Sequence, residues 1–347
     1  MAGGGMSTME KSKEELKLTR ERIVTGDRTT GKLHIGHYVG SLKNRVELQT
    51  QYETFVILAD VQALTTHFDR PHELIGHVRQ VALDYLSVGI DPESATIFVQ
   101  SLIPEIAELT IYFSMFVPVN ALRHNPTIKS EAAERGYTQL YYGFLGYPVS
   151  QAADIAFCKA TLIPVGADQL PHIEQARKIV RRFNELYKPV LVEPQALVSE
   201  VPRLVGLDGH NKMSKSMNNA INLDASREEV AEKMKKAMTD PARIRKEDPG
   251  HPDVCPVYDY HKALRNEGSG DIHQSCTAGK IGCVECKQLI ADRVNELLEP
   301  MRERRKIYES KPRFIDEMLK TGTEKARTVA KETMREVRDA LGIRYFE

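Results

Sequence analysis

The sequence TGDRTTGKLHIGH, residues 25–37, follows a short β-rich run that predicts a first strand. Gly26 and Gly31 permit tight turns and a close approach of the backbone to a ligand. His34 and His37 are three residues apart, so at a helix start both imidazoles project from one face, beside the positive helix end. The stretch therefore predicts a strand that leads into an anion-binding helix start. Taken alone, it also fits a junction whose histidines only cap and contact solvent.

Strand and helix patterns alternate around this stretch and predict an α/β fold. Between two of the expected strands, apolar residues repeat at helical spacing from Leu74 to Val88, and Gly89 supplies the stop. Strand–helix–strand units of this length require right-handed crossovers and so a parallel sheet. Ligands of such a Rossmann-like nucleotide-binding domain gather at the carboxyl ends of the strands. The expected strands are Arg22–Thr25, Thr54–Asp60, Ala95–Gln100 and Thr161–Val165.

The β signal fades after about Pro194, and helical patterns follow from Asp224 to the end. We therefore expect four parts: a disordered extension at 1–20, a Rossmann-like catalytic domain at 21–194, a loop region at 195–223, and an all-helical domain at 224–347. The last helix of that domain is expected to pack back on the catalytic domain. The extension lacks the apolar run of a signal peptide. The surest helices of the last part are Arg227–Met238, Cys286–Leu298 and Glu324–Leu341.

The composition is that of an ordinary globular chain, with 41% apolar and 28% charged residues among 347. No apolar run approaches the ~20 residues of a membrane-spanning helix, so we expect a cytoplasmic chain without a membrane partner. The 48 basic and 48 acidic residues balance. Any basic footprint for a nucleic acid must therefore be local, and each cluster also fits a solvated helix face. The clusters are Lys178, Arg181 and Arg182; Lys235, Lys236, Arg243, Arg245 and Lys246; and Arg302, Arg304, Arg305 and Lys306.

A second motif, KMSKS at Lys212–Ser216, lies in a glycine- and polar-rich stretch. Lys212 and Lys215 are three residues apart with hydroxyls between them, and such a group can clamp a polyphosphate. By itself the motif fits an exposed basic loop at least as well. Together with His34–His37, in this order and separated by a parallel α/β unit, it is far more specific. We call the two segments the histidine motif (His34–His37) and the lysine motif (Lys212–Ser216).

The two motifs resemble, letter for letter, the HIGH and KMSKS motifs of class I aminoacyl-tRNA synthetases. In that family they bracket ATP and stabilise the transition state of adenylate formation, which needs alignment and positive charge and no enzyme nucleophile. The resemblance implies four catalytic residues, His34, His37, Lys212 and Lys215. It implies an ATP site, with Mg²⁺ carried in on the nucleotide, lined by Arg28, Thr29, Thr30, Gly36, His37, Gly166, Ala167, Asp168, Leu204, Lys212, Met213, Ser214, Lys215 and Ser216.

Two further segments indicate which amino acid substrate the chain would bind. YPVSQAADI, residues 147–155, reads as a helix start that places Tyr147, Gln151 and Asp154 on one face. There Asp154 could accept a ring N–H while Tyr147 packs on a flat aromatic, although a satisfied polar patch on a packed helix is the alternative. IPVGADQ, residues 163–169, reads as a strand end that turns into a helix. Its glycine, Gly166, leaves room for a ribose, and the polar side chains of Asp168 and Gln169 could form hydrogen bonds with the ligand.

Both segments resemble the substrate-binding strings of tryptophanyl-tRNA synthetases, and the resemblance runs from about Ile23 to the C-terminus. It implies that Asp154 accepts the indole N–H and that Gly166–Asp168 contacts ATP. Thr29 stands where many members carry proline, and Gln151 where methionine is frequent. The resemblance implies L-tryptophan, ATP and tRNA(Trp) as partners, no DNA, and a homodimer. The implied tryptophan-binding residues are Gly26, Tyr147, Gln151, Asp154 and Gln169.

Three other functions remain open at this point. A tyrosyl-tRNA synthetase is the most similar of these, since an aspartate can also accept a hydrogen bond from a phenol hydroxyl. Only the size of the pocket would then distinguish tryptophan from tyrosine. A synthetase paralogue with a regulatory or binding role is the second, although the intact motifs argue against lost chemistry. A plain nucleotidyltransferase is the third, but it would not need the long helical region that follows Asp224.

Four of the five cysteines, Cys255, Cys276, Cys283 and Cys286, form a cluster in the sequence. Cys158 stands apart in an apolar segment, as a core filler. In a chain expected in the cytoplasm, such a cluster indicates a metal site rather than disulfides. Four thiolates suit zinc and a [4Fe–4S] cluster equally well. A subset of bacterial tryptophanyl-tRNA synthetases carries a [4Fe–4S] cluster on similar spacing, so the resemblance favours iron–sulfur, with zinc and unligated thiols as alternatives. It also implies that the helical domain at 224–347 binds the anticodon, and we expect the cluster to stabilise that region rather than to act in redox chemistry.

Overall fold

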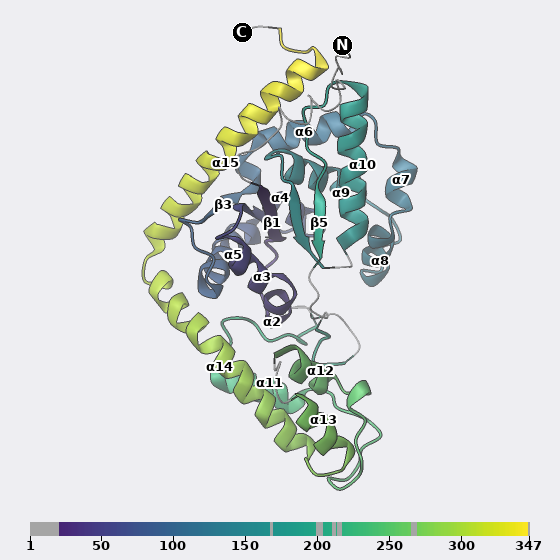
Figure 1. The fold of residues 1–347 in the computed structure, drawn as a ribbon, viewed down its shortest axis with the longest axis vertical. Helices are drawn as coiled ribbons and strands as arrows, with labels where there is room; N and C mark the ends of the chain where they lie inside the picture. The colour runs from purple at the N-terminus through teal and green to yellow at the C-terminus, as the bar shows by residue number, and fades with distance from the viewer. Residues whose placement is uncertain are drawn as a thin grey trace, which may run out of the picture.

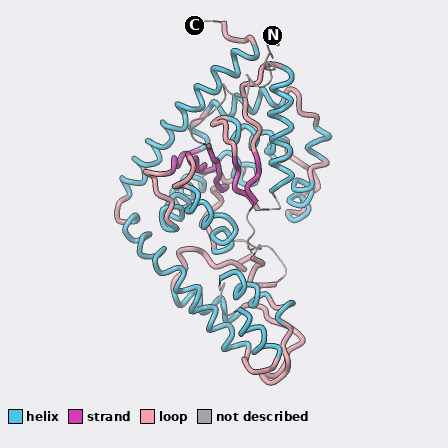
Figure 2. Tube along the Cα trace, in the orientation of Figure 1, coloured by secondary structure: helices cyan, strands magenta, loops and turns pink. Residues whose placement is uncertain are grey.

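A parallel five-stranded sheet forms the centre of the N-terminal part, in the order β3-β2-β1-β4-β5 (Figures 1 and 2). The computed structural model describes residues 21–166, 169–198, 204–209, 213, 217–264 and 269–345; the extension expected at 1–20 lies outside them. All four neighbouring pairs are parallel, which confirms the predicted fold class. The strands are β1 (Arg22–Arg28), β2 (Glu53–Ala59), β3 (Ala95–Val99), β4 (Leu162–Val165) and β5 (Gln195–Val198).

The order of the strands reverses at β1, because β2 and β3 lie on one side of it and β4 and β5 on the other. In open α/β sheets ligands bind at such a switch point, outside the carboxyl ends of the strands. β5 is absent from the predicted strands. Its burial pattern, half-buried residues between exposed ones, is that of an edge strand, which lacks the continuous apolar run of a central parallel strand.

Helices flank the sheet on both faces. α5 ends at the predicted residue, where Gly89 adopts φ 104°. α9 begins at Tyr142 rather than at the predicted Tyr147, so Pro148 lies inside the helix and not in its first turn. The helical elements are α2 (Ile35–His37), η1 (Tyr38–Leu42), α3 (Lys43–Leu48), α4 (Asp60–His67), η2 (Pro71–Glu73), α5 (Leu74–Val88), η3 (Gln100–Leu102), α6 (Pro104–Ser114), α7 (Val119–Arg123), α8 (Pro126–Glu134), α9 (Tyr142–Ala156) and α10 (Leu170–Leu186).

The C-terminal part is helical, as expected. Two long helices, α14 and α15, run along one side of the molecule and join the lower helices to the sheet (Figure 1). α15 approaches β3 so closely that a Cβ on Gly322 would lie 2.0 Å from the Ile97 carbonyl oxygen. None of the described helices is long and apolar enough to cross a membrane. The elements are α11 (Arg227–Lys236), η5 (Pro252–Val254), α12 (Pro256–Leu264), α13 (Ser269–Thr277), α14 (Cys283–Glu309) and α15 (Pro312–Leu341).

One hydrophobic core cluster crosses the boundary between the two parts. It includes Leu33 and Ile35 beside the first strand, Tyr85 of α5, and Val294 of α14. Met213 of the lysine motif is buried in the same cluster. The helical part is therefore packed directly against the segment that carries the histidine motif, and the two are not joined by a linker alone.

Candidate functional site

The histidine motif begins where the chain leaves β1. Gly31 adopts φ 113°, a backbone conformation that side chains rarely allow, and the chain then enters α2 with His34 as its N-cap. The backbone N–H of His34 donates to Nδ1 of His37 at 3.2 Å. The two imidazole centroids lie 3.8 Å apart. The structure thus brings the two predicted catalytic histidines together at the carboxyl end of β1.

The backbone around the lysine motif pairs with the histidine motif. The Ile35 N–H donates to the Ile221 carbonyl at 2.9 Å, and the Leu223 N–H donates to the Leu33 carbonyl at 3.0 Å. A Cβ placed on Gly36 would lie 2.8 Å from Sδ of Met213. Met213 therefore lies against the histidine motif. The other predicted residues of the lysine motif, Lys212, Ser214, Lys215 and Ser216, lie outside the described residues.

The remaining predicted ATP contacts lie in different environments. Thr29 is fully buried, and its hydroxyl has no hydrogen-bond partner among the described residues. The Thr30 N–H donates to the carbonyl of Arg28 at 2.9 Å. Leu204 is only 5% exposed and packs in the same core cluster as Met213. Gly166 follows β4 directly; Ala167 and Asp168 lie outside the described residues.

Behind the histidine motif, Asp27 pairs with a buried arginine that sequence reasoning did not identify. Arg45 Nη1 lies 2.6 Å from the Asp27 carboxylate, and the Tyr85 hydroxyl donates to the same oxygen at 2.9 Å. Burial raises the pKa of Asp27, but Arg45, His37 and the Tyr85 hydroxyl outweigh it and leave that pKa at about 2. The Asp27 carboxylate therefore stays charged beside His37. The neighbouring Gly26 cannot carry a side chain without a backbone shift, since a Cβ there would lie 2.2 Å from the Ile57 carbonyl oxygen.

Asp154 is buried, and two glutamines hold its carboxylate. Gln100 Nε2 donates to one oxygen at 2.7 Å and Gln62 Nε2 to the other at 3.3 Å. Burial raises the pKa of Asp154 to about 7 despite these donors, and the Asp60 carboxylate adds to the rise. Neither glutamine was predicted, although each follows or lies near the end of a strand where ligands gather. Among the described residues, amides orient the carboxylate and no cation forms an ion pair with it.

Three other predicted tryptophan contacts lie on α9 or directly before α10: Tyr147, Gln151 and Gln169. The Tyr147 hydroxyl lies 2.8 Å from Nε2 of His172. Burial and the Glu131 carboxylate raise the pKa of Tyr147 well above its usual value, and Arg28 lowers it. Arg28 itself forms an ion pair with Glu131 at 3.3 Å, so a predicted ATP contact and a predicted tryptophan contact share this glutamate. The side-chain oxygen of Gln151 is buried without a partner among the described residues, and Gln169 occupies the N-cap position of α10.

Comparison with known proteins decides the family. The family of class I tRNA synthetases (W and Y) matches residues 17–299. The tryptophan–tRNA ligase of Thermotoga maritima is 47% identical over 328 residues, which are 93% of this chain and 100% of that protein. This chain belongs to the tryptophan–tRNA ligases.

Solved structures agree with this membership. The tryptophanyl-tRNA synthetase of Campylobacter jejuni, crystallised with ADP and tryptophan, has a TM-score of 0.80 at 31% identity and covers 92% of this chain and 99% of its own. The tyrosyl-tRNA synthetase of Archaeoglobus fulgidus, solved with L-tyrosine, reaches a TM-score of 0.66 at 23% identity, covering 86% and 94%. At that identity the tyrosyl enzyme shares the fold alone.

The four clustered cysteines of this tryptophan–tRNA ligase gather between η5, α13 and the start of α14. All of them are free thiols, and three pack against the apolar side chains of Tyr258, Ile272 and Ile281. Burial raises the pKa of Cys286 to about 12, and the other three thiols add to the rise, so all four are close enough to interact. Cationic or polar nitrogens are adjacent: Arg243 Nη1 lies 3.6 Å from Sγ of Cys276 and His261 Nε2 lies 3.3 Å from Sγ of Cys286.

These thiols do not form a closed metal site. Among the described residues, no group of three or more His, Cys, Asp or Glu side chains is arranged to hold a metal ion. The predicted donors are therefore of the right type and in one region, but their side chains do not converge on one centre. The expectation of a [4Fe–4S] cluster or of zinc is not confirmed by this geometry.

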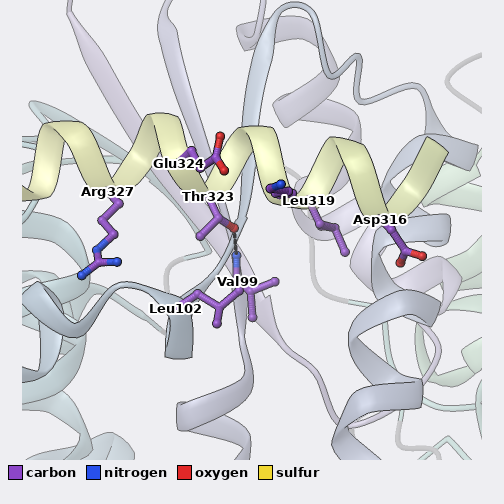
Figure 3. Close-up of a pocket in the computed structure, with 8 residues that line it drawn as sticks. Val99, Leu102, Asp316, Leu319, Thr323, Glu324 and Arg327 are labelled. Atoms are coloured by element: carbon purple, nitrogen blue, oxygen red, sulfur yellow. Dashed lines mark hydrogen bonds between the residues drawn. The ribbon is translucent and has the colours of Figure 1, made fainter. Parts of the chain in front are cut away.

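A cavity of about 420 Å³ lies elsewhere on the ligase, between α15 and the end of β3 (Figure 3). The Thr323 hydroxyl in its wall accepts a hydrogen bond from the Val99 N–H at 3.3 Å. None of the predicted site residues line it. Its lining consists of Val99, Leu102, Asp316, Leu319, Lys320, Thr323, Glu324 and Arg327.

Proposed function

We propose that this ligase activates L-tryptophan with ATP, forming tryptophanyl-adenylate and pyrophosphate, and then transfers tryptophan to tRNA(Trp). The observation that carries the proposal is the contact between Gly36 of the histidine motif and Met213 of the lysine motif. Because Gly36 and Met213 lie together near the carboxyl end of β1, we infer that groups from both motifs would reach one nucleotide. Family membership supports tryptophan rather than tyrosine as the amino acid.

Adenylate formation needs positive charge and hydrogen-bond donors around the α-phosphate and the departing pyrophosphate. His34 and His37 would provide donors from one side, and Lys212 and Lys215 would provide charge from the other. Gly36 would leave a surface on which the adenine base can lie. Mg²⁺ would enter with ATP and neutralise phosphate charge. Arg28, Thr29, Thr30, Gly166, Ala167, Asp168, Leu204, Met213, Ser214 and Ser216 complete the proposed ATP site.

We propose that Asp154 recognises the indole ring. Its carboxylate would accept the indole N–H, and Gln62 and Gln100 would hold it in that orientation. A buried acceptor that is left unpaired disfavours amino acids that lack a ring donor. Tyr147 would pack against the ring, and the unpartnered oxygen of Gln151 would be available to the substrate. Gly26 and Gln169 complete the proposed tryptophan site.

Pyrophosphate exchange with each of the twenty amino acids, followed by charging of tRNA(Trp), tests this function. Exchange that depends on tryptophan, with charging of the tRNA, is expected. Exchange with tyrosine would favour a tyrosyl enzyme. Adenylate formation without charging would favour a regulatory or binding paralogue.

We propose further that Cys255, Cys276, Cys283 and Cys286 hold a [4Fe–4S] cluster that staples the helical, anticodon-reading region. The support is the gathering of four free, interacting thiols beside Arg243. Thiolate ligands suit iron–sulfur clusters and zinc alike, so zinc is the alternative occupant. The cysteine side chains would have to move to bring the sulfurs to one centre. No step of adenylate formation depends on this group.

A homodimer in the cytoplasm is the proposed working form. Large apolar side chains are exposed around the end of α6, where Ile111 is 52%, Met115 73% and Val119 53% exposed. Ile111 and Met115 are four residues apart and so lie on one helical face. Large exposed apolar side chains that share a helical face are typical of a protein interface. Light scattering on the wild type and on Met115→Glu tests it, with a dimer expected for the wild type and a weakened one for the variant.

A further inference from the structure

A buried ion pair connects the helical part to the peptide group that precedes the histidine motif. Asp84 of α5 is fully buried, and one of its oxygens accepts the backbone N–H of Leu33 at 2.7 Å. The other oxygen lies 2.6 Å from Nη1 of Arg305 on α14. Leu33 directly precedes His34, so one carboxylate joins α14 to the start of the motif.

The same peptide is held from its other side. The carbonyl of Leu33 accepts the N–H of Leu223, in the segment that follows the lysine motif. Asp224, next to Leu223, forms an ion pair with Lys32 and lies 4.0 Å from Nη2 of Arg305. Both backbone groups of Leu33 thus depend on residues near the Arg305 guanidinium.

We propose that Asp84 and Arg305 are positioning residues that set the place of the histidine motif from α14. The proposal rests on the proposed role of that motif in adenylate formation. Alignment of reacting groups is worth up to about a hundredfold in rate per ångström of displacement. Two short hydrogen bonds through buried atoms connect α14 to Leu33, because Asp84 is fully buried and the Arg305 side chain is only 8% exposed.

Arg302 offers a matched control three residues earlier on α14. Its side chain is 12% exposed, against 8% for Arg305. Its hydrogen bonds end on Ala225, Asn295 and Glu299, and none of them reaches α5. Arg302→Met therefore removes a similarly buried guanidinium of the same helix without breaking the connection through Asp84 to the Leu33 N–H.

The experiment compares Arg305→Met, Asp84→Asn and Arg302→Met in the full chain. Amide hydrogen exchange of the segment that contains Leu33 should accelerate about tenfold or more in the first two variants, and little in Arg302→Met. Single-turnover adenylate formation should fall about tenfold or more in the same two variants, while tryptophan affinity stays within about threefold. If Arg305→Met does not fold, the same two measurements on the isosteric Asp84→Asn variant test the proposal.

Two outcomes would overturn the inference: unchanged exchange at Leu33 in Asp84→Asn, or equal losses of rate in Arg305→Met and Arg302→Met. Wild-type protein that forms no adenylate would refute the proposed function instead. In that case the hydrogen-exchange comparison, which needs no substrate, still shows whether α14 holds Leu33 in place. The two failures are therefore distinguishable.

Discussion

Sδ of Met213 occupies the space that a side chain on Gly36 would need. A Cβ on Gly36 would lie 2.8 Å from this sulfur and 2.9 Å from Nδ1 of His34. The histidine and lysine motifs, which are far apart in the sequence, therefore touch through a glycine and a methionine. Among the described residues, this contact and the backbone hydrogen bonds of Ile35 and Leu33 with Ile221 and Leu223 bring the two segments together.

Gly36→Ala is expected to slow adenylate formation about tenfold or more, because the methyl group displaces Met213 or His34. Gly40→Ala is the matched control, since nothing lies within 4 Å of a Cβ at that position. Adding Met213→Ala to Gly36→Ala makes room for the methyl group and should restore part of the rate. Equal rates for Gly36→Ala and Gly40→Ala, measured in single turnover, would show that the contact is unimportant.

The stability of the wild type relative to Asp154→Asn should depend on pH. Burial raises the pKa of Asp154 from 3.8 to about 7, so the folded protein binds a proton that the unfolded chain has released between these values. The stabilising contribution is full below about pH 4 and is lost as the pH rises through about 7, by up to about 4 kcal/mol. Urea unfolding at pH 8 and pH 5 measures it. A stability difference that does not move in favour of the wild type at pH 5 would contradict this environment for Asp154.

Gln100→Leu should weaken tryptophan binding about tenfold or more, because the Asp154 carboxylate loses its 2.7 Å donor. A hydrogen bond to a charged group contributes about 1.5–3 kcal/mol. Gln49→Leu removes another buried glutamine, whose amide donates to the carbonyl of Gly89, and serves as the control. Titration calorimetry with tryptophan compares the two. Equal affinities in both variants would mean that Gln100 does not orient Asp154.

Protein purified without oxygen should contain about four iron and four sulfide per chain if the proposed cluster is present. Cys286→Ser should lose most of the iron, whereas Cys158→Ala should keep it, because Cys158 is buried in the core away from the other thiols. Elemental analysis of the wild type, Cys286→Ser and Cys158→Ala measures the iron content of each. A colourless preparation that contains zinc would establish the alternative metal and refute the cluster.

Local patterns in the sequence predicted the parts of the fold that depend on local periodicity. The apolar repeat of α5 and its glycine stop, four of the five strands, and the two motifs are of this kind. β5 was missed because it is half-exposed and carries no long apolar run, unlike β3, which is buried throughout at the other edge of the sheet. The start of α9 was placed too late because proline usually marks a first turn, whereas Pro148 lies within the helix.

Contacts between distant residues could not be predicted in the same way. Asp84 and Arg305 are 221 positions apart, and nothing in either neighbourhood indicates a partner. Gln62 and Gln100 lie near predicted strand ends, so their region was expected to hold ligands, but their contact with Asp154 depends on the packing of α9. The cysteine spacing identified four candidate donors. It could not show where their sulfurs point, and in the structure they do not converge.

The central claim is that both motifs act on one nucleotide during tryptophan activation. Single-turnover formation of tryptophanyl-adenylate by the wild type and by Lys215→Ala tests it most directly, with tryptophan affinity measured alongside. We predict that the variant binds tryptophan within about threefold of the wild type but forms the adenylate about a hundredfold more slowly, because the departing pyrophosphate loses a positive charge. Similar rates for the two proteins, or equal losses of rate and of tryptophan affinity, would contradict the claim.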